Sequence, residues 1–296
     1  MAGVAFKLAQ LLLQESHKAG AGAAALESEA TAALEVGAQQ GFFAPSVEVC
    51  IRQLIALRQG QGKVSDALAL AERYRDASTN DVNRAVLSRM CLQLRFQDAM
   101  EHERFADALR LGIDLLAGDD RDFKQVENLL KAFGLAARRT RRDPGRGEVI
   151  GSVTAWVNRA QARWDRLGEA IDEDAVTPAT IAQVKALRDE TLVQAVVAEH
   201  TDPSGASEAR PLADGLTVLL AEYPDLPGAY FQRMLAWDQL ADDADTDAEK
   251  AEAREYSLAD AREVLNRSTN AQQKQAAADL IKEHTPEDET SPEDDA

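Results

Sequence analysis

The sequence is poor in the features that mark disulfide-rich and membrane-spanning proteins. Of its 296 residues, two are cysteine, nine are proline and 5% are aromatic. Two thiols are too few for a disulfide scaffold in a chain of this length, so we expect Cys50 and Cys91 to be buried free thiols. No uncharged apolar run approaches the roughly 18 residues that a membrane-spanning helix needs. These shortages favour a folded chain with an ordinary hydrophobic core.

Signals for β-strands are missing as well. No stretch alternates apolar and polar residues between hairpin turns. Apolar residues instead recur every three or four positions, which is typical of amphipathic helices. Short breaks such as QGQG at 59–62 and YPDLP at 223–227 predict that neighbouring helices pack antiparallel. We expect helices around 47–55, 64–71, 87–94, 105–116, 123–133, 150–167, 181–197 and 212–223.

The number and shortness of these segments favour a repeat architecture. About a dozen short helices in succession cannot all reach one core, so we predict an all-α, irregular solenoid of antiparallel helix pairs. Two longer segments without helical periodicity, at 138–147 and 201–211, divide the predicted solenoid into smaller arrays of helices. We expect an N-terminal helical-repeat region at 1–140, a C-terminal helical-repeat region at 141–284 and a disordered acidic tail at 285–296.

The stretch from Leu212 to Trp237 supports a more specific interpretation. Pro224 ends one helix, Pro227 suits the first turn of the next, and Tyr230 and Trp237 follow. This stretch resembles the tetratricopeptide repeat, and 51–80 and 105–116 resemble it in degenerate form. The resemblance implies stacked helix pairs with a concave surface that binds a peptide or a helix of another protein.

Other residues limit what the resemblance implies. Some tetratricopeptide proteins hold chaperone tails with a lysine and asparagine clamp. The matching positions here are Arg52 and Ala56 in one repeat and Phe231 and Leu235 in another, which argues against that ligand.

The segments that resemble phosphate-binding and calcium-binding motifs lack residues that those motifs require. QGQGKVS at 59–65 lacks the first glycine and the hydroxyl of a phosphate loop. DADTDAEKAEAR at 243–254 has Ala248 and Arg254 where a calcium loop needs glycine and glutamate. The four histidines are far apart, without metal-ligand spacing. We therefore expect no enzyme activity, no metal and no cofactor.

The chain is strongly acidic. Its formal net charge is −18, and residues 285–296 hold six acids and no base, so the rest carries −12. An acidic body repels phosphate backbones and disfavours nucleic acid as a partner. The acidic segment is either a solubilising tail or an attractant for a basic partner. The N-terminal stretch has Lys7 within its apolar run and no cleavage site, so we expect neither a signal peptide nor a membrane span and place the protein in the cytoplasm.

One cluster of five arginines is basic, in contrast to the acidic composition of the rest of the chain. Arginines near the end of a helix are favourable with its dipole, which gives a structural explanation. The functional alternative is an anion patch for an acidic segment of a partner or of this chain. The cluster consists of Arg138, Arg139, Arg141, Arg142 and Arg146.

The hypothesis that we favour is a noncatalytic interaction module or adaptor that binds a peptide or protein on a helical surface. The alternatives are an acidic, chaperone-like assembly factor that shields a basic client and, less favoured, a regulatory subunit of an enzyme complex. We predict partner contacts at the arginine cluster and at Tyr230, Phe231 and Trp237, although such aromatic residues also serve as core. The sequence leaves the oligomeric state open.

Overall fold

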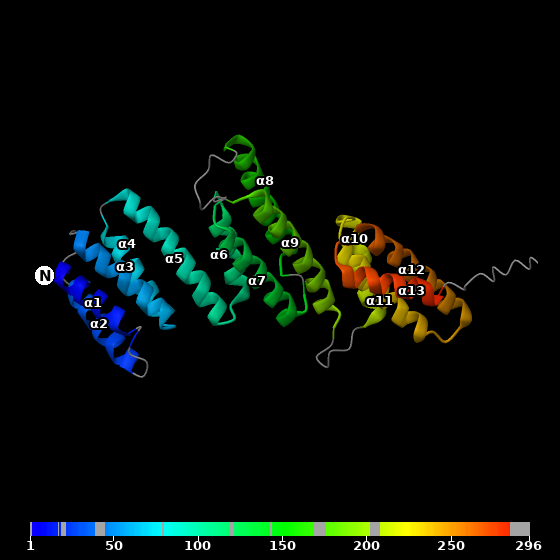
Figure 1. Cartoon of the computed structure of the whole chain (residues 1–296), viewed down its shortest axis with the longest axis horizontal. Helices are drawn as coiled ribbons and strands as arrows, with labels where there is room; N and C mark the ends of the chain where they lie inside the picture. The colour runs from blue at the N-terminus through cyan, green and yellow to red at the C-terminus, as the bar shows by residue number, and fades with distance from the viewer. Residues whose placement is uncertain are drawn as a thin grey trace, which may run out of the picture. The chain divides into compact units, whose positions relative to one another are not determined.

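The computed structural model contains only α-helices as regular elements in the part of the chain that it describes. The described residues are 2–16, 18, 22–38, 45–78, 80–118, 121–142, 144–167, 176–201 and 208–284. They form α1 (Ala2–Ser16), α2 (Ala23–Ala38), α3 (Pro45–Gly60), α4 (Val64–Ala77), α5 (Asp81–Glu101), α6 (Phe105–Leu116), α7 (Phe123–Thr140), α8 (Arg146–Leu167), α9 (Pro178–Glu199), α10 (Ala209–Glu222), α11 (Pro227–Asp242), α12 (Asp247–Arg267) and α13 (Ala271–His284) (Figure 1).

The chain divides into two compact units. The first covers Met1–Ala117 and contains α1 to α6, and the second covers Gly118–Ala296 and contains α7 to α13. Each unit has its own buried cluster of apolar side chains. The predicted domain boundary at 140 falls between α7 and α8, inside the second unit, and it stays a prediction about where the chain can be separated.

The first unit is built from helices that pack on their neighbours in sequence. Ala67 and Ala71 of α4 are fully buried, and Tyr74 fills the space beside them. Between α3 and α4 the chain turns at Gly62, whose φ of 72° lies in the left-handed region that glycine adopts without strain. The small side chains of Ala67 and Ala71 let the neighbouring helices approach α4 closely.

The second unit begins with three helices packed together. α7 packs against α9, and α8 contacts both (Figure 1). The start of α9 is fixed by Thr177, whose hydroxyl accepts a hydrogen bond from the amide of Thr180 at 3.2 Å, and by Pro178 in its first turn. This capping fixes the register of α9, which lines both grooves described below.

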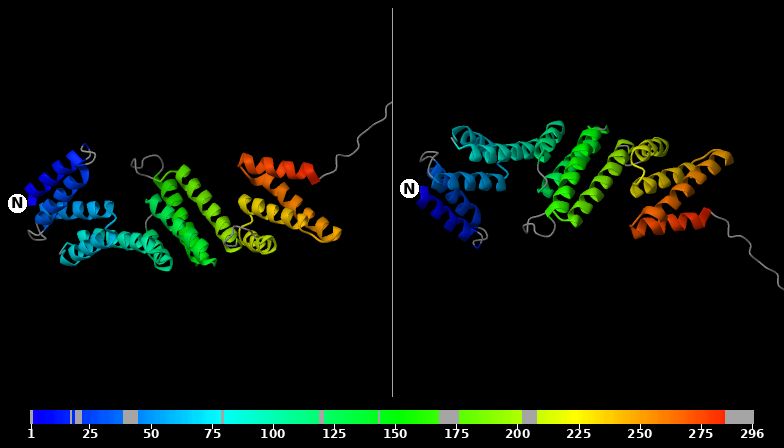
Figure 2. Two further views of the ribbon diagram at one scale, coloured as in Figure 1. Left: turned by 90° about the horizontal axis from the view of Figure 1, so that it is seen from below. Right: turned by 90° about the horizontal axis from the view of Figure 1, so that it is seen from above.

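The remaining helices of the second unit follow as consecutive pairs. α10 packs on α11, α11 on α12 and α12 on α13, as the views of Figure 2 also show. α10 ends at Glu222 and α11 begins with Pro227, so the prediction of one helix ending and the next beginning within the YPDLP stretch is confirmed.

The all-α helical-repeat prediction is therefore confirmed for the described residues. The helices predicted around 123–133, 150–167 and 181–197 correspond to α7, α8 and α9, and the one predicted at 212–223 corresponds to α10, which ends one residue earlier. Cys50 and Cys91 are buried and free. The predicted disordered tail at 285–296 lies outside the described residues. No helix in the described ranges is long and apolar enough to cross a membrane.

Candidate protein-binding surface

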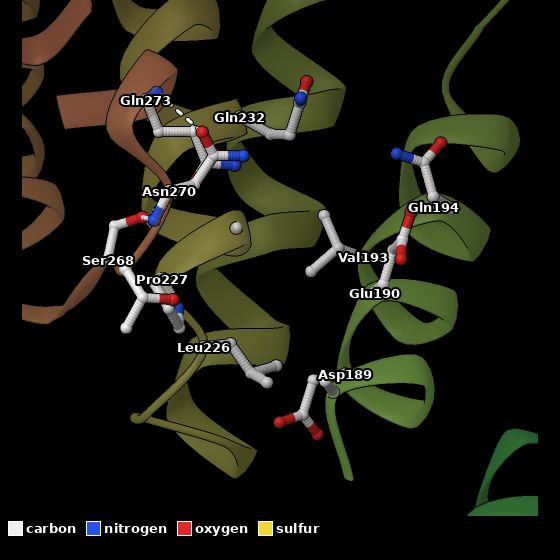
Figure 3. Close-up of a pocket in the computed structure, with 13 residues that line it drawn as sticks. Asp189, Glu190, Val193, Gln194, Leu226, Pro227, Gln232, Ser268, Asn270 and Gln273 are labelled. Carbon is white, nitrogen blue, oxygen red and sulfur yellow. Dashed lines mark hydrogen bonds between the residues drawn. The ribbon is translucent and has the colours of Figure 1, made fainter. Parts of the chain in front are cut away.

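A groove of about 460 Å³ lies between α9 and α11. Its volume is within the range of roughly 300–1,000 Å³ that is typical of ligand sites. Val193 of α9, Leu226 and Pro227 give it apolar walls. Residues 268–270 and Gln273, in the link to α13 and its first turn, close it on the side away from α9 (Figure 3). The groove is therefore built from three segments of the second unit.

Two primary amides in this groove have no hydrogen-bond partner in the part of the chain that the structure describes. Gln194 of α9 and Gln232 of α11 both line it, and among the described residues neither side chain makes a hydrogen bond. Each amide group offers both donors and an acceptor. An extended peptide backbone presents both N–H and C=O groups, so the two side chains can hydrogen-bond such a backbone while apolar side chains contact the walls.

The far wall is held by its own hydrogen bonds. The hydroxyl of Ser268 donates to Oε1 of Gln273 at 2.8 Å, and Oδ1 of Asn270 accepts from the backbone amides of Gln272 and Gln273 at 2.9 and 3.3 Å. Asn270 therefore caps the start of α13. These bonds order the wall before any partner binds, which lowers the entropic cost of binding.

Carboxylates mark the α9 side of the groove. Asp189 is paired with Arg188, whose Nη2 lies 2.7 Å from Oδ1. Glu190 is exposed and makes no ion pair in the described part of the chain. An unpaired carboxylate beside an apolar wall favours a basic side chain in the partner.

A second groove, of about 520 Å³, lies between α7 and α9 and shares Glu190 and Gln194 with the first. A Cβ atom added to Gly134 of α7 would lie 3.9 Å from the methyl group of Thr191, so the two helices approach closely there. Lys131 and Arg138 line the α7 side. The two grooves thus adjoin along one face of α9, with cations on one side of the face and amides on the other.

An ion pair holds the helices that support the first groove. Arg233 of α11 donates from Nε and Nη2 to the two carboxylate oxygens of Asp260 of α12, at 2.8 and 2.7 Å. Its Nη1 also donates to the hydroxyl of Thr217 of α10 at 3.0 Å. Asp260 is 3% exposed, and burial raises the pKa of its carboxyl, an effect that the hydrogen bonds from Arg233 oppose. Three helices are therefore tied through one guanidinium.

Two of the predicted aromatic contacts pack within the unit. Tyr230 and Phe231 are half-buried against the cluster formed by α11, α12 and α13. The guanidinium carbons of Arg233 and Arg267 each lie 5.6 Å from the centroid of the Tyr230 ring, within the range of cation–π attraction. Neither aromatic residue belongs to the lining of the two grooves.

The third predicted aromatic residue, Trp237, is 8% exposed. Its ring lies 4.8 Å from that of Tyr256 of α12, centroid to centroid, and 5.2 Å from the guanidinium carbon of Arg210 of α10. It therefore contributes to the packing of α10, α11 and α12. Its part in binding a partner stays a prediction.

The arginine cluster surrounds the turn between α7 and α8. Arg138 lines the α7–α9 groove. Arg141 ends α7 in a left-handed conformation, with a φ of 50°. Arg146 opens α8, where its Nη2 lies 3.9 Å from Oε2 of Glu222 at the end of α10. Arg138, Arg139, Arg141 and Arg142 are exposed.

Sequence reasoning missed the amides and the walls of the first groove. Asp189, Gln232 and Asn270 are separated by some forty residues at each step, and no local motif connects them. The YPDLP stretch was the one usable signal, because its Leu226 and Pro227 form part of the wall. In the described residues, no group of three or more histidine, cysteine or acidic side chains is placed to hold a metal ion.

The comparisons with known proteins are sparse. No family model matches the chain, and neither does any curated protein. Among solved structures, it is similar to a tetratricopeptide repeat protein from Parabacteroides merdae, at 11% identity over 93% of this chain and 98% of that chain, with a TM-score of 0.36. A similarity of this size says nothing about ligands; the repeat fold is established by the packing of the helices described above.

Proposed function

We propose that this protein is a noncatalytic interaction module whose α9–α11 groove binds an extended segment of a partner protein. The observation that carries the proposal is the pair of amides of Gln194 and Gln232, which have no hydrogen-bond partner among the described residues and lie beside the apolar walls of an ordered groove. Glu190 adds a preference for a basic residue in that segment. The arginine cluster and the three aromatic residues of α11 are proposed as additional contacts.

The proposal includes a cytoplasmic location. The two free, buried thiols fit a reducing compartment, in which disulfides are rare. Cell fractionation with an antibody against the chain tests this part separately from the binding test.

The binding test replaces one groove residue and one matched residue outside the groove. Gln232→Arg places a long cation where the partner backbone would lie. The variant should therefore no longer capture the proteins that the original chain captures from a lysate of its source cells. Gln183→Arg is the control, because Gln183 is exposed on α9 and lines neither groove. Captured proteins are identified and quantified by mass spectrometry.

The proposal requires a protein that the original chain and Gln183→Arg both retain and that Gln232→Arg loses at least about tenfold, the effect of about 1.4 kcal/mol. Equal retention by all three chains would exclude the α9–α11 groove as the binding surface. Matching circular dichroism spectra of the two variants ensure that a loss reflects the groove rather than unfolding.

A second candidate function rests on the net charge of −18, which favours an acidic assembly factor that shields a basic client. Salt separates the two functions. Binding that depends on general acidity weakens steeply as ionic strength rises, whereas amide and apolar contacts in a groove respond little. Capture of a basic protein that is insensitive to the Gln232→Arg change, yet lost in high salt or on removal of 285–296, would favour the assembly factor.

A further inference from the structure

The α7–α9 groove has a basic side that nothing in the described chain neutralises. Lys131 and Arg138 lie seven residues apart on α7, both exposed, and exposed Leu135 lies between them on the same face. Among the described residues neither cation makes an ion pair. Lys124, also in the lining, is instead paired with Glu127 at 2.9 Å. Lys131 and Arg138 are therefore available to an acidic ligand.

This basic side belongs to a basic segment of an acidic protein. Residues 123–146 carry seven lysines and arginines and two acids, while the whole chain has a net charge of −18. A local reversal of charge of this kind attracts an acidic segment and repels the rest of an acidic surface. The α7 side of this groove, opposite Glu190 of α9, therefore fits an acidic ligand.

The chain itself contains a segment of that chemistry. Residues 285–296, TPEDETSPEDDA, hold six acids, two prolines and no base. Proline fixes an extended backbone and suits a groove ligand more than a helix. This segment follows directly on α13, in the same compact unit as α7 and α9.

The residue that precedes the segment is held by a side-chain contact. His284, the last residue of α13, has its Nε2 3.1 Å from Oδ1 of Asp238 on α11. Asn270 and Gln273, at the other end of α13, line the groove beside α9. The 14 residues of α13 span about 20 Å, and twelve extended residues span up to about 40 Å. The segment can therefore return along α13 and reach the far side of α9.

We infer that residues 285–296 bind within their own chain and reach the α7–α9 groove, with the carboxylates at 293–295 against Lys131 and Arg138. Glu190 and Gln194 line this groove and also the α9–α11 groove, so the bound segment lies beside the surface that we propose for partners. The inference shares Arg138 with the additional contacts proposed for a partner, but it does not depend on the α9–α11 groove, because it concerns the α7 side of α9 and an occupant from this chain.

The first test adds the segment to a chain that lacks it. A fluorescent peptide of residues 285–296 is titrated into a chain that ends at His284, and its anisotropy is measured. We expect saturable binding that weakens about tenfold with Lys131→Glu and Arg138→Glu together, because both contacts become repulsive. The matched control combines Lys185→Glu with Arg166→Glu, which are exposed and line neither groove.

Two results would overturn the inference. One is no binding of the peptide at low salt, where screening is weakest. The other is binding that both double variants weaken equally, which would show a response to general charge rather than to this groove. A peptide with the six acids replaced by their amides should not bind.

The second test uses the full chain and locates the contact. A carbodiimide couples a lysine amine to a carboxylate only when the two are in contact. We expect a link between Lys131 and a carboxylate of 285–296 inside a single chain, found by mass spectrometry of the monomer. A link to Lys131 that forms only between two chains would assign the groove to a second copy and contradict the inference.

Discussion

At the scale of single residues, the closest helix contacts depend on glycines that admit no side chain. A Cβ atom added to Gly37 of α2 would lie 2.7 Å from Sγ of Cys50 of α3 and 3.3 Å from Cβ of Ala5 of α1. Real Cβ atoms do not approach sulfur so closely, so α2 or Cys50 would have to shift. Gly37 therefore sets how closely three helices pack in the first unit.

Because of this contact, we predict that replacing Gly37 by alanine destabilises the helix instead of stabilising it. In an open helix, replacing glycine by alanine stabilises by roughly 0.5–1 kcal/mol. Gly37→Ala should instead lower the free energy of unfolding by about 1 kcal/mol, because overpacking outweighs helix propensity. Urea denaturation followed by circular dichroism measures the change.

A double-mutant cycle identifies the obstacle. In a Cys50→Ala background the 2.7 Å contact is gone, and the cost of Gly37→Ala should fall to near zero. The control is Gly151→Ala in α8, where no atom lies within 4 Å of the added Cβ atom and the change should stabilise. An equal cost in both backgrounds would show that the Cβ atoms of Ala5 and of residue 50, each at 3.3 Å, and not the thiol, are the obstacle.

At the scale of helices, the Arg233–Asp260 pair carries the next prediction. Removing one partner of a buried ion pair leaves an uncompensated charge, which costs about 3–5 kcal/mol. Asp260→Ala should therefore lower the free energy of unfolding of the second unit by about 3 kcal/mol, measured by tryptophan fluorescence in urea. Arg233→Met combined with Asp260→Leu should cost less than Asp260→Ala alone. A larger cost for the double variant would contradict this account of the pair.

The helices also show how far the sequence could predict the fold. Helices with a regular stripe of large apolar residues, such as α6 and α7, could be predicted with their approximate bounds. α12 could not, because its buried face consists of Ala253, Ser257, Asp260, Ala261 and Val264. These residues have helical spacing but little hydrophobic contrast. Asp260 is buried because Arg233, 27 residues earlier, pairs with it, and no local pattern reveals that.

The candidate site was less predictable than the fold. The arginine cluster stands out in the sequence because it is basic in an acidic chain, and Arg138 does line a groove. Aromatic residues stand out because they are rare, and Trp237 is nearly buried. Gln194 and Gln232 have no distinguishing sequence context. They become a candidate site because α9 and α11 bring them to one groove, where neither has a hydrogen-bond partner within the described ranges.

At the scale of the whole molecule, the unfolding of each unit can be followed by a different type of residue. Both cysteines lie in the first unit, and Trp156, Trp164 and Trp237 lie in the second. Burial raises the pKa of the Cys50 and Cys91 thiols, and the thiolate is the reactive form. In the folded chain both thiols should therefore react slowly with a thiol reagent at pH 8 and become reactive when the first unit unfolds.

These reporters predict two unfolding transitions. Each unit buries its own apolar cluster, and repeat arrays are stabilised mainly by contacts between near neighbours. Along a urea series, thiol labelling should report one midpoint and tryptophan fluorescence another. Coincident midpoints, together with equal effects of Asp260→Ala on both reporters, would show that the chain unfolds as one cooperative unit.

The measurement that tests the account most directly is site-specific photo-crosslinking from the α9–α11 groove. A photoreactive residue placed at Gln232 should crosslink to a partner polypeptide in a lysate of the source cells, while the same residue at Gln183, exposed and outside both grooves, should not. The crosslinked peptide should be an extended segment with a basic residue, which is what Glu190 favours. Crosslinks of equal yield at both positions, or at Gln183 alone, would contradict the assignment of this groove as the binding surface.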